Sequence, residues 1–390
     1  MKLNYLKASS YRNINDAGIG FSDGVNLLYG KNGAGKTNAL EAIYLFAICK
    51  SFRTGKEKDF IMHGCDSASL SMSFSSDFDR KDSLSHKMSL SFFADGRKKM
   101  TYEGVEISRI SEFAGRFRAV FFTPDHLSLI KGSPDERRRF CDMALCQIKP
   151  GYIRYLNEYH RILAQRNALL RGAKLDGKLD RAMLDVYSFA LAEKAATITR
   201  QRAGFAEYLE RESAPVYRFI SGSRENLFID YLCAGKQDPS DTEKVKEKYI
   251  SLYTENVESE IKYGATKAGP HKDDFVFYIA KNKNDFCGEK TDEQDVSYTE
   301  FAARTFASQG QQRSAVLALK LAEGEIIKAL CGEHPVYLFD DVLSELDSER
   351  KECLLSLFEK KQVIITCCDE NAFDDSLVSN KIRVENGTYI

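Results

Sequence analysis

Residues 30–37 read GKNGAGKT, which matches the pattern G-x-x-x-x-G-K-[ST] of a phosphate-binding loop. The loop follows the strand-like run VNLLY at Val25–Tyr29 and opens the helix-like run TNALEAIYLFAICK. Because strand, loop and helix agree with the context that this motif needs, we interpret it as a nucleotide site and not as an unliganded glycine-rich turn. The motif leaves open which nucleotide binds.

The residue types of this loop fit phosphate binding. Its glycines let backbone N–H groups turn inward around the phosphates, and the N-terminus of the next helix adds its dipole. Lys36 is expected to reach the terminal phosphates, and the Thr37 hydroxyl is expected to ligate Mg²⁺. The predicted nucleotide-binding residues are Gly30, Lys31, Asn32, Gly33, Ala34, Gly35, Lys36 and Thr37.

A second pattern related to nucleotides, NKND at Asn282–Asp285, resembles the guanine-reading NKxD element of GTPases. It lies in the charged stretch Lys281–Asp295, which otherwise has the composition of a hairpin turn or loop. A long helical segment also separates it from Lys36. A four-letter pattern in a polar loop is weak evidence, so a GTPase is the disfavoured alternative.

The run VYLFDD at Val336–Asp341 has the form of a Walker B strand, which is apolar and ends in two carboxylates. Such a strand is expected to place Asp340 close to the phosphate loop, where it can hold Mg²⁺ directly or through water. Asp341 is then expected where a base can orient the attacking water. For this pair alone, an acidic turn after a core strand is the alternative.

Residues 308–313 read SQGQQR and resemble the S-x-G-Q signature of ABC ATPases. They begin a predicted helix whose apolar face contains Ala315, Leu319, Ala322, Ile326 and Leu330. The Ser308 hydroxyl, the close backbone approach that Gly310 permits and the helix N-terminus near Gln311 together form an anion site.

The signature stretch is expected to contact the nucleotide of a partner chain, because the chain already has its own phosphate loop. SELD at Ser344–Asp347 matches the D-loop, which lies along the dimer interface in ABC proteins. We therefore predict an ATP-dependent homodimer, with Lys36, Asp340, Asp341 and Ser308 as catalytic residues.

The order of apolar runs predicts an α/β fold, an ABC-type P-loop ATPase head with a strand-rich extension and an inserted helical lobe. The expected boundaries are 1–131 and 262–390 for the two parts of the ATPase lobe and 132–261 for the helical insert. The expected strands are Leu3–Ser9, Val25–Tyr29, Leu70–Phe74, Met88–Phe93, Ala119–Phe122, Phe275–Ala280, Val336–Phe339 and Gln362–Thr366.

The composition excludes several classes of protein. With 56 Lys and Arg against 57 Asp and Glu, no global positive field draws the molecule onto nucleic acid, so any DNA contact must come from a local basic patch. The 10 cysteines show no CxxC pair or zinc spacing and are expected to be reduced and mostly buried. No apolar run approaches the roughly 20 residues that cross a bilayer, so we expect a cytoplasmic protein.

Five stretches in collinear order resemble the RecF family of bacterial recombination mediators. They are YRN at Tyr11–Asn13, FFTPDHLSLIKGSPDERRRFCD at Phe121–Asp142, AGPHKDDF at Ala268–Phe275, FASQGQQR at Phe306–Arg313 and DDVLSELD at Asp340–Asp347. The resemblance covers nearly the whole chain, and its middle motifs are far more specific than a phosphate loop. The motifs also resemble the heads of chromosome-maintenance ATPases, but the insert is too short for a long coiled coil.

The resemblance implies a DNA replication and repair protein of the DNA-damage (SOS) response. It implies ATP-dependent dimerisation, binding to single- and double-stranded DNA at gaps or junctions, slow ATP hydrolysis, and work with RecO and RecR to load recombinase. It also suggests that Arg12 and Asn13 line the adenine and ribose side of the nucleotide.

The chain departs from the family pattern at three places. The stretch Lys281–Thr299 is longer and more charged than the family's hairpin there. Cys141 and Cys367 stand where an apolar residue and Thr are expected, respectively. A switch histidine is absent after Gln362–Ile365, which leaves Thr366 as the polar candidate.

Some residues and functions remain open at this point. Arg137, Arg138 and Arg139 follow a strong helix start at Ser133, but adjacent helical residues are about 100° apart, so the three cannot all face one ligand. The sequence supports two interpretations of these arginines equally: solvated or ion-paired side chains, and contacts with phosphate. Among functions, a transporter ATPase subunit is disfavoured, and a structural chromosome protein with little ATP turnover is the alternative to a repair ATPase.

Overall fold

A computed structural model describes the chain in two compact units, Met1–His126 with Val316–Ile390 and Leu127–Ala315. The described residues are 1–53, 56–78, 85–222, 225–234, 241–280, 302–341, 357–358, 360–371 and 373–390. The NKND pattern, the charged stretch Lys281–Thr299 and the D-loop at Ser344–Asp347 lie outside them.

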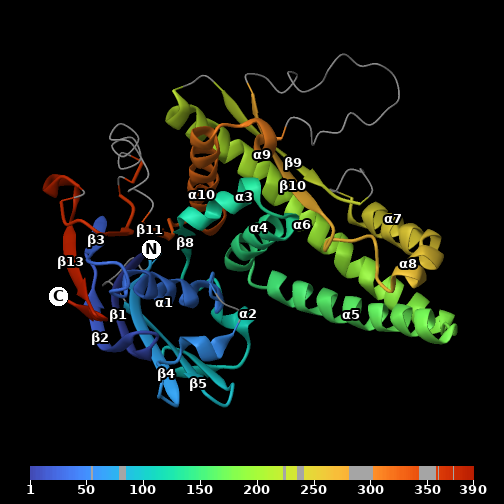
Figure 1. The fold of residues 1–390 in the computed structure, drawn as a ribbon, viewed down its shortest axis with the longest axis horizontal. Coiled ribbons are helices and arrows are strands. Elements are labelled where there is room, and N and C mark those ends of the chain that lie inside the picture. The colour runs from blue at the N-terminus through green and yellow to red at the C-terminus, as the bar shows by residue number, and fades with distance from the viewer. Residues whose placement is uncertain are drawn as a thin grey trace. The chain divides into compact units, whose positions relative to one another are not determined.

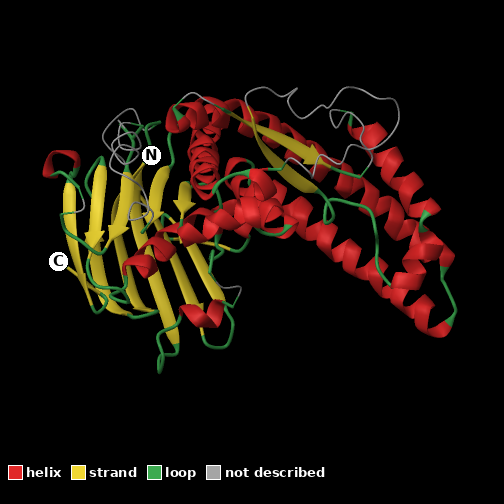
Figure 2. Ribbon diagram, turned by 45° about the horizontal axis from the view of Figure 1, so that its top comes forward, coloured by secondary structure: helices red, strands yellow, loops and turns green. Residues whose placement is uncertain are grey.

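The first unit contains two sheets of six strands (Figures 1 and 2). One sheet is parallel except for β14, and it consists, in spatial order, of β14 (Thr388–Tyr389), β13 (Asn380–Glu385), β3 (Val25–Tyr29), β12 (Val363–Cys367), β11 (Val336–Asp340) and β8 (Ala119–Phe122). The other is antiparallel, with β2 (Ile14–Gly20), β1 (Lys2–Tyr11), β4 (Ser67–Ser75), β5 (Ser85–Phe93), β6 (Lys98–Tyr102) and β7 (Val105–Ile107).

Helix α1 (Lys36–Ile48) is buried on nearly every side, because it contacts β8, β11 and β12 of the parallel sheet and β5 of the antiparallel sheet. Its run from Ala39 to Ile48 is apolar except for Glu41, as expected for a helix with no solvent face. Helix α2 (Ile110–Phe113) and 3₁₀ turns at Glu57–Phe60 and Asp375–Leu377 also belong to this unit.

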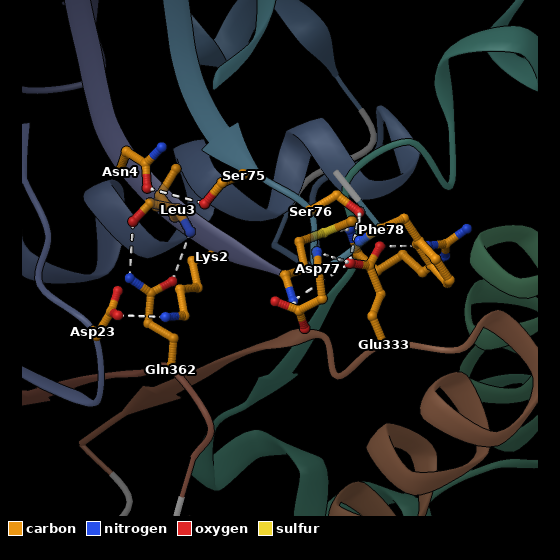
Figure 3. A network of polar contacts seen from close by, with 12 residues as sticks. Lys2, Leu3, Asn4, Asp23, Ser75, Ser76, Asp77, Phe78, Glu333 and Gln362 are labelled. Atoms are coloured by element: carbon orange, nitrogen blue, oxygen red, sulfur yellow. Dashed lines mark hydrogen bonds and ion pairs between the residues drawn. The ribbon is translucent and has the colours of Figure 1, made fainter. Parts of the chain in front are cut away.

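A buried glutamine joins the two sheets of the first unit (Figure 3). Gln362 accepts a hydrogen bond from the Leu3 N–H at 2.7 Å and donates to the carbonyls of Leu3, at 2.8 Å, and Ser22, at 3.0 Å. Nearby, the buried carboxylate of Glu333 accepts hydrogen bonds from the Ser76 hydroxyl at 2.8 Å and from the Asp77 N–H at 3.1 Å. Side chains thus satisfy backbone groups at the edge where the sheets meet.

The second unit is mostly helical. Its elements are α3 (Ser128–Lys131), α4 (Pro134–Ile148), α5 (Tyr152–Asp176), α6 (Arg181–Ser221), β9 (Asn226–Leu232), α7 (Thr242–Glu255), α8 (Val257–Tyr263), β10 (Asp274–Ala280) and α9 (Ala303–Phe306). Helix α6 packs against α5, α7 and β9, while β9 and β10 form an antiparallel pair (Figure 1). A 3₁₀ turn at Pro124–Leu127 and helix α10 (Gln309–Cys331) run from one unit into the other.

Buried arginines of the second unit are paired with carboxylates. Arg166 is fully buried against the fully buried Glu260 at 2.7 Å, and Arg202 makes two contacts of 2.9 Å with Asp142. Buried charges of this kind require partners, because an unpaired charge in an apolar interior is strongly unfavourable.

The eight predicted strands are all present, but the sequence analysis missed β2, β6, β7, β9, β13 and β14. The apolar face of α10 is buried at Ala315, Leu319, Ala322 and Ile326, whereas Leu330 is exposed. The expected border at residues 261 and 262 differs from the observed one, because β10 pairs with β9, so that residues 262–315 belong to the second unit.

The described cysteines are all free, but the expectation that most are buried was wrong. Cys49, Cys141 and Cys367 are buried, Cys368 is exposed, and the others among them are half-buried. Within the described ranges, no helix is both long enough and apolar enough to cross a membrane.

Candidate nucleotide site

The phosphate loop connects the end of β3 to the start of α1, as the sequence predicts. Gly30, Gly33 and Gly35 have φ values of 152°, 81° and 120°, in the region that favours glycine. At Gly30 a Cβ atom would lie 2.3 Å from the Val384 carbonyl oxygen of β13, so a side chain does not fit there. The backbone conformation thus favours glycine at all three positions, and close packing against β13 also requires it at Gly30.

Lys36 lies at the first position of α1 with its ammonium group over the loop. Its Nζ donates to the carbonyl oxygens of Gly30, at 2.5 Å, and Lys31, at 3.0 Å, and it lies 4.0 Å from the Cys368 sulfur. The residue is only 7% exposed, so this positive charge is desolvated. An anion among the loop N–H groups would meet a poorly hydrated cation, which strengthens the attraction.

Thr37 and Asp340 meet although 303 positions separate them in the sequence. The Thr37 hydroxyl donates to Asp340 Oδ1 at 2.9 Å, and the Thr366 hydroxyl donates to the same oxygen at 2.8 Å. Parallel pairing of β11 with β12 brings Asp340 opposite Thr366, at the end of the sheet where α1 begins. The predicted Walker B strand is thus beside the phosphate loop.

Burial raises the pKa of Asp340, the neighbouring Asp341 raises it further, and the two threonine hydroxyls lower it. A desolvated carboxylate beside a hydroxyl fits Mg²⁺, a hard cation that prefers oxygen ligands. Among the described residues there is no group of three or more His, Cys, Asp and Glu side chains that could hold a metal. Mg²⁺ is usually held by one or two carboxylates together with substrate phosphates, and Asp340 can supply one such carboxylate.

Asp341 follows β11 with φ of 52°, a left-handed conformation that is uncommon for residues other than glycine. Its N–H donates to the Thr366 hydroxyl oxygen at 3.0 Å. Thr366, which the sequence analysis singled out in place of a switch histidine, therefore contacts both carboxylate residues. The half-buried Asp341 lies directly beyond the proposed Mg²⁺ ligand.

The structure places Arg12 and Asn13 differently from one another. Arg12 forms an ion pair with Glu41 of α1, through contacts of 2.8 and 2.9 Å, and that carboxylate is completely buried. Asn13 donates to the Gly33 carbonyl at 3.3 Å and accepts from the Asn38 amide at 2.7 Å. Asn13 therefore contacts the phosphate loop directly, whereas Arg12 pairs with α1, the helix that follows this loop.

The signature residues begin helix α10 in the second unit. The Ser308 N–H donates to the side-chain oxygen of Gln311 at 2.7 Å, and the Gln311 N–H donates to the Ser308 hydroxyl at 3.3 Å. This reciprocal arrangement is a capping box. The Gln311 amide also donates to Glu225 at 2.8 and 2.9 Å. Ser308 itself is exposed, and Gly310 is half-buried.

The three adjacent arginines of α4 point in different directions, as helix geometry requires. Arg137 is buried and forms an ion pair with Asp274 through contacts of 2.7 and 2.9 Å. Arg138 donates to the Asp273 carbonyl and to the Asp135 carboxylate, whereas Arg139 is exposed. Arg137 is therefore committed to the interior of the second unit.

The AGPHKDDF motif forms a buried turn in the second unit. His271 contacts the Tyr159 hydroxyl at 2.6 Å, and burial lowers its pKa to about 4, so the ring is neutral at pH 7. Burial raises the pKa of Asp273 to about 6, and Tyr231 donates a hydrogen bond to it. These contacts give the motif a structural role inside this unit.

Comparison with known proteins decides the family. The family described as "RecF/RecN/SMC N terminal domain" matches residues 2–389. A protein of Staphylococcus carnosus named DNA replication and repair protein RecF is 36% identical over 396 residues, which cover 100% of both chains. A protein of the same name from Ruminiclostridium cellulolyticum is 35% identical over 376 residues, 96% of this chain and 95% of that one. The chain belongs to the RecF family.

Solved structures agree with this assignment. A structure of the recombination mediator protein RecF with ATP, in the RecFOR pathway, has 30% identity and a TM-score of 0.87, and it covers 100% of this chain and 97% of that one. The head of an Smc protein bound to the winged-helix domain of ScpA has 16% identity and a TM-score of 0.55 over 100% of this chain and 96% of that one, which shows a shared fold. The predicted resemblance to RecF and the predicted ATPase-head fold are both confirmed.

Two residues at the RecF-type site were missed in the sequence analysis. Glu41 lies in the apolar run of α1 and was not predicted as a site residue, although it binds Arg12, Tyr11 and Ser51. Tyr389 was not considered, yet its hydroxyl donates to the Gly35 carbonyl at 2.9 Å. A buried charge in a strongly apolar helix was a usable signal for Glu41. No local pattern marks Tyr389.

Proposed function

We propose that this chain is an ATP-dependent DNA replication and repair protein that binds ATP and Mg²⁺ at the phosphate loop. The observation that carries the proposal is the contact of Thr37 with Asp340 at 2.9 Å, beside the desolvated Lys36. A hydroxyl, a carboxylate, an ammonium group and loop N–H groups converge there, as the binding of a nucleotide triphosphate requires. The names of the RecF relatives support the repair role.

The chain's own residues have separate roles in this proposal. Lys36 would leave the Gly30 and Lys31 carbonyls and bind the terminal phosphate oxygens. Thr37 and Asp340 would hold Mg²⁺, which when bound neutralises charge on the phosphates. Asp341 would orient the attacking water. Thr366 fixes both carboxylate residues through its hydroxyl.

The nucleotide site is completed, in this proposal, by a second copy of the chain. Ser308 is exposed and caps a helix N-terminus, which is a site that favours an anion. Its hydroxyl and the N–H groups near Gly310 would contact the phosphates bound by Lys36 of the partner. ATP would thereby hold the dimer closed on gapped or junction DNA, and slow hydrolysis would release it. The RecFOR pathway named for the solved RecF structure supports action together with RecO and RecR.

The proposal is tested by the binding of gapped DNA in a gel-shift assay with and without ATP. The wild-type chain should bind more tightly with ATP, and Lys36→Ala should lose both ATP affinity and the ATP-dependent shift. A loss of at least 10²-fold in ATP affinity is expected for removal of a desolvated, phosphate-bound charge. ATP affinity that survives in Lys36→Ala would contradict the proposal. An ATP-dependent shift in a chain without measurable ATP turnover would favour the alternative, a structural chromosome protein.

A further inference from the structure

The hairpin of β13 and β14 touches the phosphate loop on the side of its carbonyl groups. The Gly387 N–H donates to the Ala34 carbonyl at 2.7 Å, and the Tyr389 hydroxyl donates to the Gly35 carbonyl at 2.9 Å. The Asn13 side chain holds the Gly33 carbonyl at 3.3 Å. Three successive carbonyls of the loop therefore each receive a donor from outside the loop.

Peptide geometry turns these contacts into a constraint on the N–H groups. The carbonyl and the N–H of one trans peptide unit lie in a plane and point in opposite directions. Holding the Ala34 and Gly35 carbonyls outward therefore directs the N–H groups of Gly35 and Lys36 to the other side of the loop. In a phosphate loop these N–H groups receive the phosphate oxygens.

The local packing leaves the loop little freedom. A Cβ atom at Gly387 would lie 2.3 Å from the Asn13 carbonyl oxygen, and one at Gly35 would lie 3.3 Å from the Tyr389 hydroxyl. Tyr389 is half-buried, and burial raises its pKa, so the phenol stays protonated and remains a donor. Gly35 is also the N-cap of α1, and its carbonyl accepts a hydrogen bond from the Ala39 N–H at 3.1 Å.

We propose that the β13–β14 hairpin preorganises the phosphate loop, and that Tyr389 is a positioning residue for the nucleotide phosphates. The inference rests on the proposed function and adds a residue that no motif contains. It separates two roles at one site, since Lys36 supplies charge to the phosphates and Tyr389 fixes the direction of the backbone donors. Removing the hydroxyl should weaken phosphate binding without removing the site.

The test compares Tyr389→Phe with Tyr102→Phe, which also removes one hydrogen-bonded hydroxyl from the first unit. Tyr102 is half-buried in β6 of the antiparallel sheet, and its hydroxyl contacts His86 Nδ1 at 2.9 Å, so it serves as the control. Affinities for ATP and for inorganic tripolyphosphate, which lacks the base and sugar, are measured together with the Tm of the ligand-free protein. Tyr389→Phe should lose roughly fivefold in both affinities, which corresponds to one net hydrogen bond. Tyr102→Phe should leave both unchanged.

The outcomes distinguish the inference from the proposed function. An unchanged ATP affinity in Tyr389→Phe would overturn the inference, as would an ATP affinity that falls while tripolyphosphate affinity stays the same. Either result leaves the proposed function intact if Lys36→Ala still abolishes ATP binding. A wild-type chain that binds neither ATP nor tripolyphosphate would overturn the proposed function and the inference with it.

Discussion

The phosphate loop and the signature turn are both turns at helix N-termini, but they are held in different ways. The phosphate loop receives contacts from residues far away in the sequence, such as Asn13, Asp340 and Tyr389. The signature turn is held by its own helix, through the pairing of Ser308 with Gln311, and by Glu225. Its serine is exposed.

This difference indicates how the two segments divide the work of binding. A loop in which the carbonyls of Gly33, Ala34 and Gly35 are held from outside can present its N–H groups without reorganising, so it suits the first binding step. The exposed N-terminus of a helix favours an anion, because its N–H groups and dipole point toward solvent. It can therefore bind phosphates that are held by another molecule. Four experiments test whether the two segments have these separate roles.

The largest effect is expected for Ser308→Arg, which adds bulk and an unmatched charge to the signature turn. The isolated monomer should bind ATP with wild-type affinity, because Lys36 and its loop are unchanged. Dimerisation in sedimentation and ATP turnover should both fail. Thr254→Arg, which also replaces an exposed hydroxyl of the second unit, is the matched control and should behave as wild type.

Mixing two inactive variants tests whether the site combines two chains. In a mixed dimer of Ser308→Arg with Lys36→Ala, one composite site carries both changes and the other carries neither. Some ATP turnover should therefore return when the two are mixed. If Ser308→Arg alone abolishes ATP binding by the monomer, the residue belongs to its own chain's pocket and the comparison fails.

A smaller effect is expected for Asp341→Asn, which keeps the size of the side chain and removes its charge. ATP binding and dimerisation should persist, because Lys36, Thr37 and Asp340 are unchanged. Turnover should fall about 10²-fold, the lower range for loss of a general base, and dimers with trapped ATP should accumulate. The measurement is single-turnover hydrolysis alongside sedimentation. Normal hydrolysis would mean that the base lies elsewhere.

The smallest effect is expected for Glu225→Ala, which removes the partner of the Gln311 amide. Gln311 would lose one restraint on its orientation, so turnover in the dimer should fall roughly fivefold, the equivalent of one hydrogen bond. ATP affinity of the monomer should not change. A lower ATP affinity of the monomer would show that the signature turn and the phosphate loop of one chain are coupled, and would contradict their separate roles.

Much of this protein is determined by local sequence. The phosphate loop, the Walker B strand and the start of α10 depend on glycine positions, an apolar run and a capping residue, which act within a few residues. The strands of the parallel sheet that surround the loop are apolar, and they were predicted for the same reason. The edge strand β14 has only two residues, and β13 (NKIRVE) alternates polar with apolar residues, so neither contains a continuous apolar run.

Only the tertiary structure decided which residues support the loop. Glu41 binds Arg12 because α1 packs beside the end of β1, and Tyr389 reaches Gly35 because β13 pairs with β3. Arg137 is committed to Asp274, which lies 137 positions away, so its neighbours in sequence could not reveal its role. Local sequence specifies which residues can bind phosphate, whereas contacts between distant strands fix the backbone that presents them. The physical reason is that a hydrogen bond needs its donor and acceptor in the correct positions. When the two are far apart in the sequence, only folding of the chain brings them together.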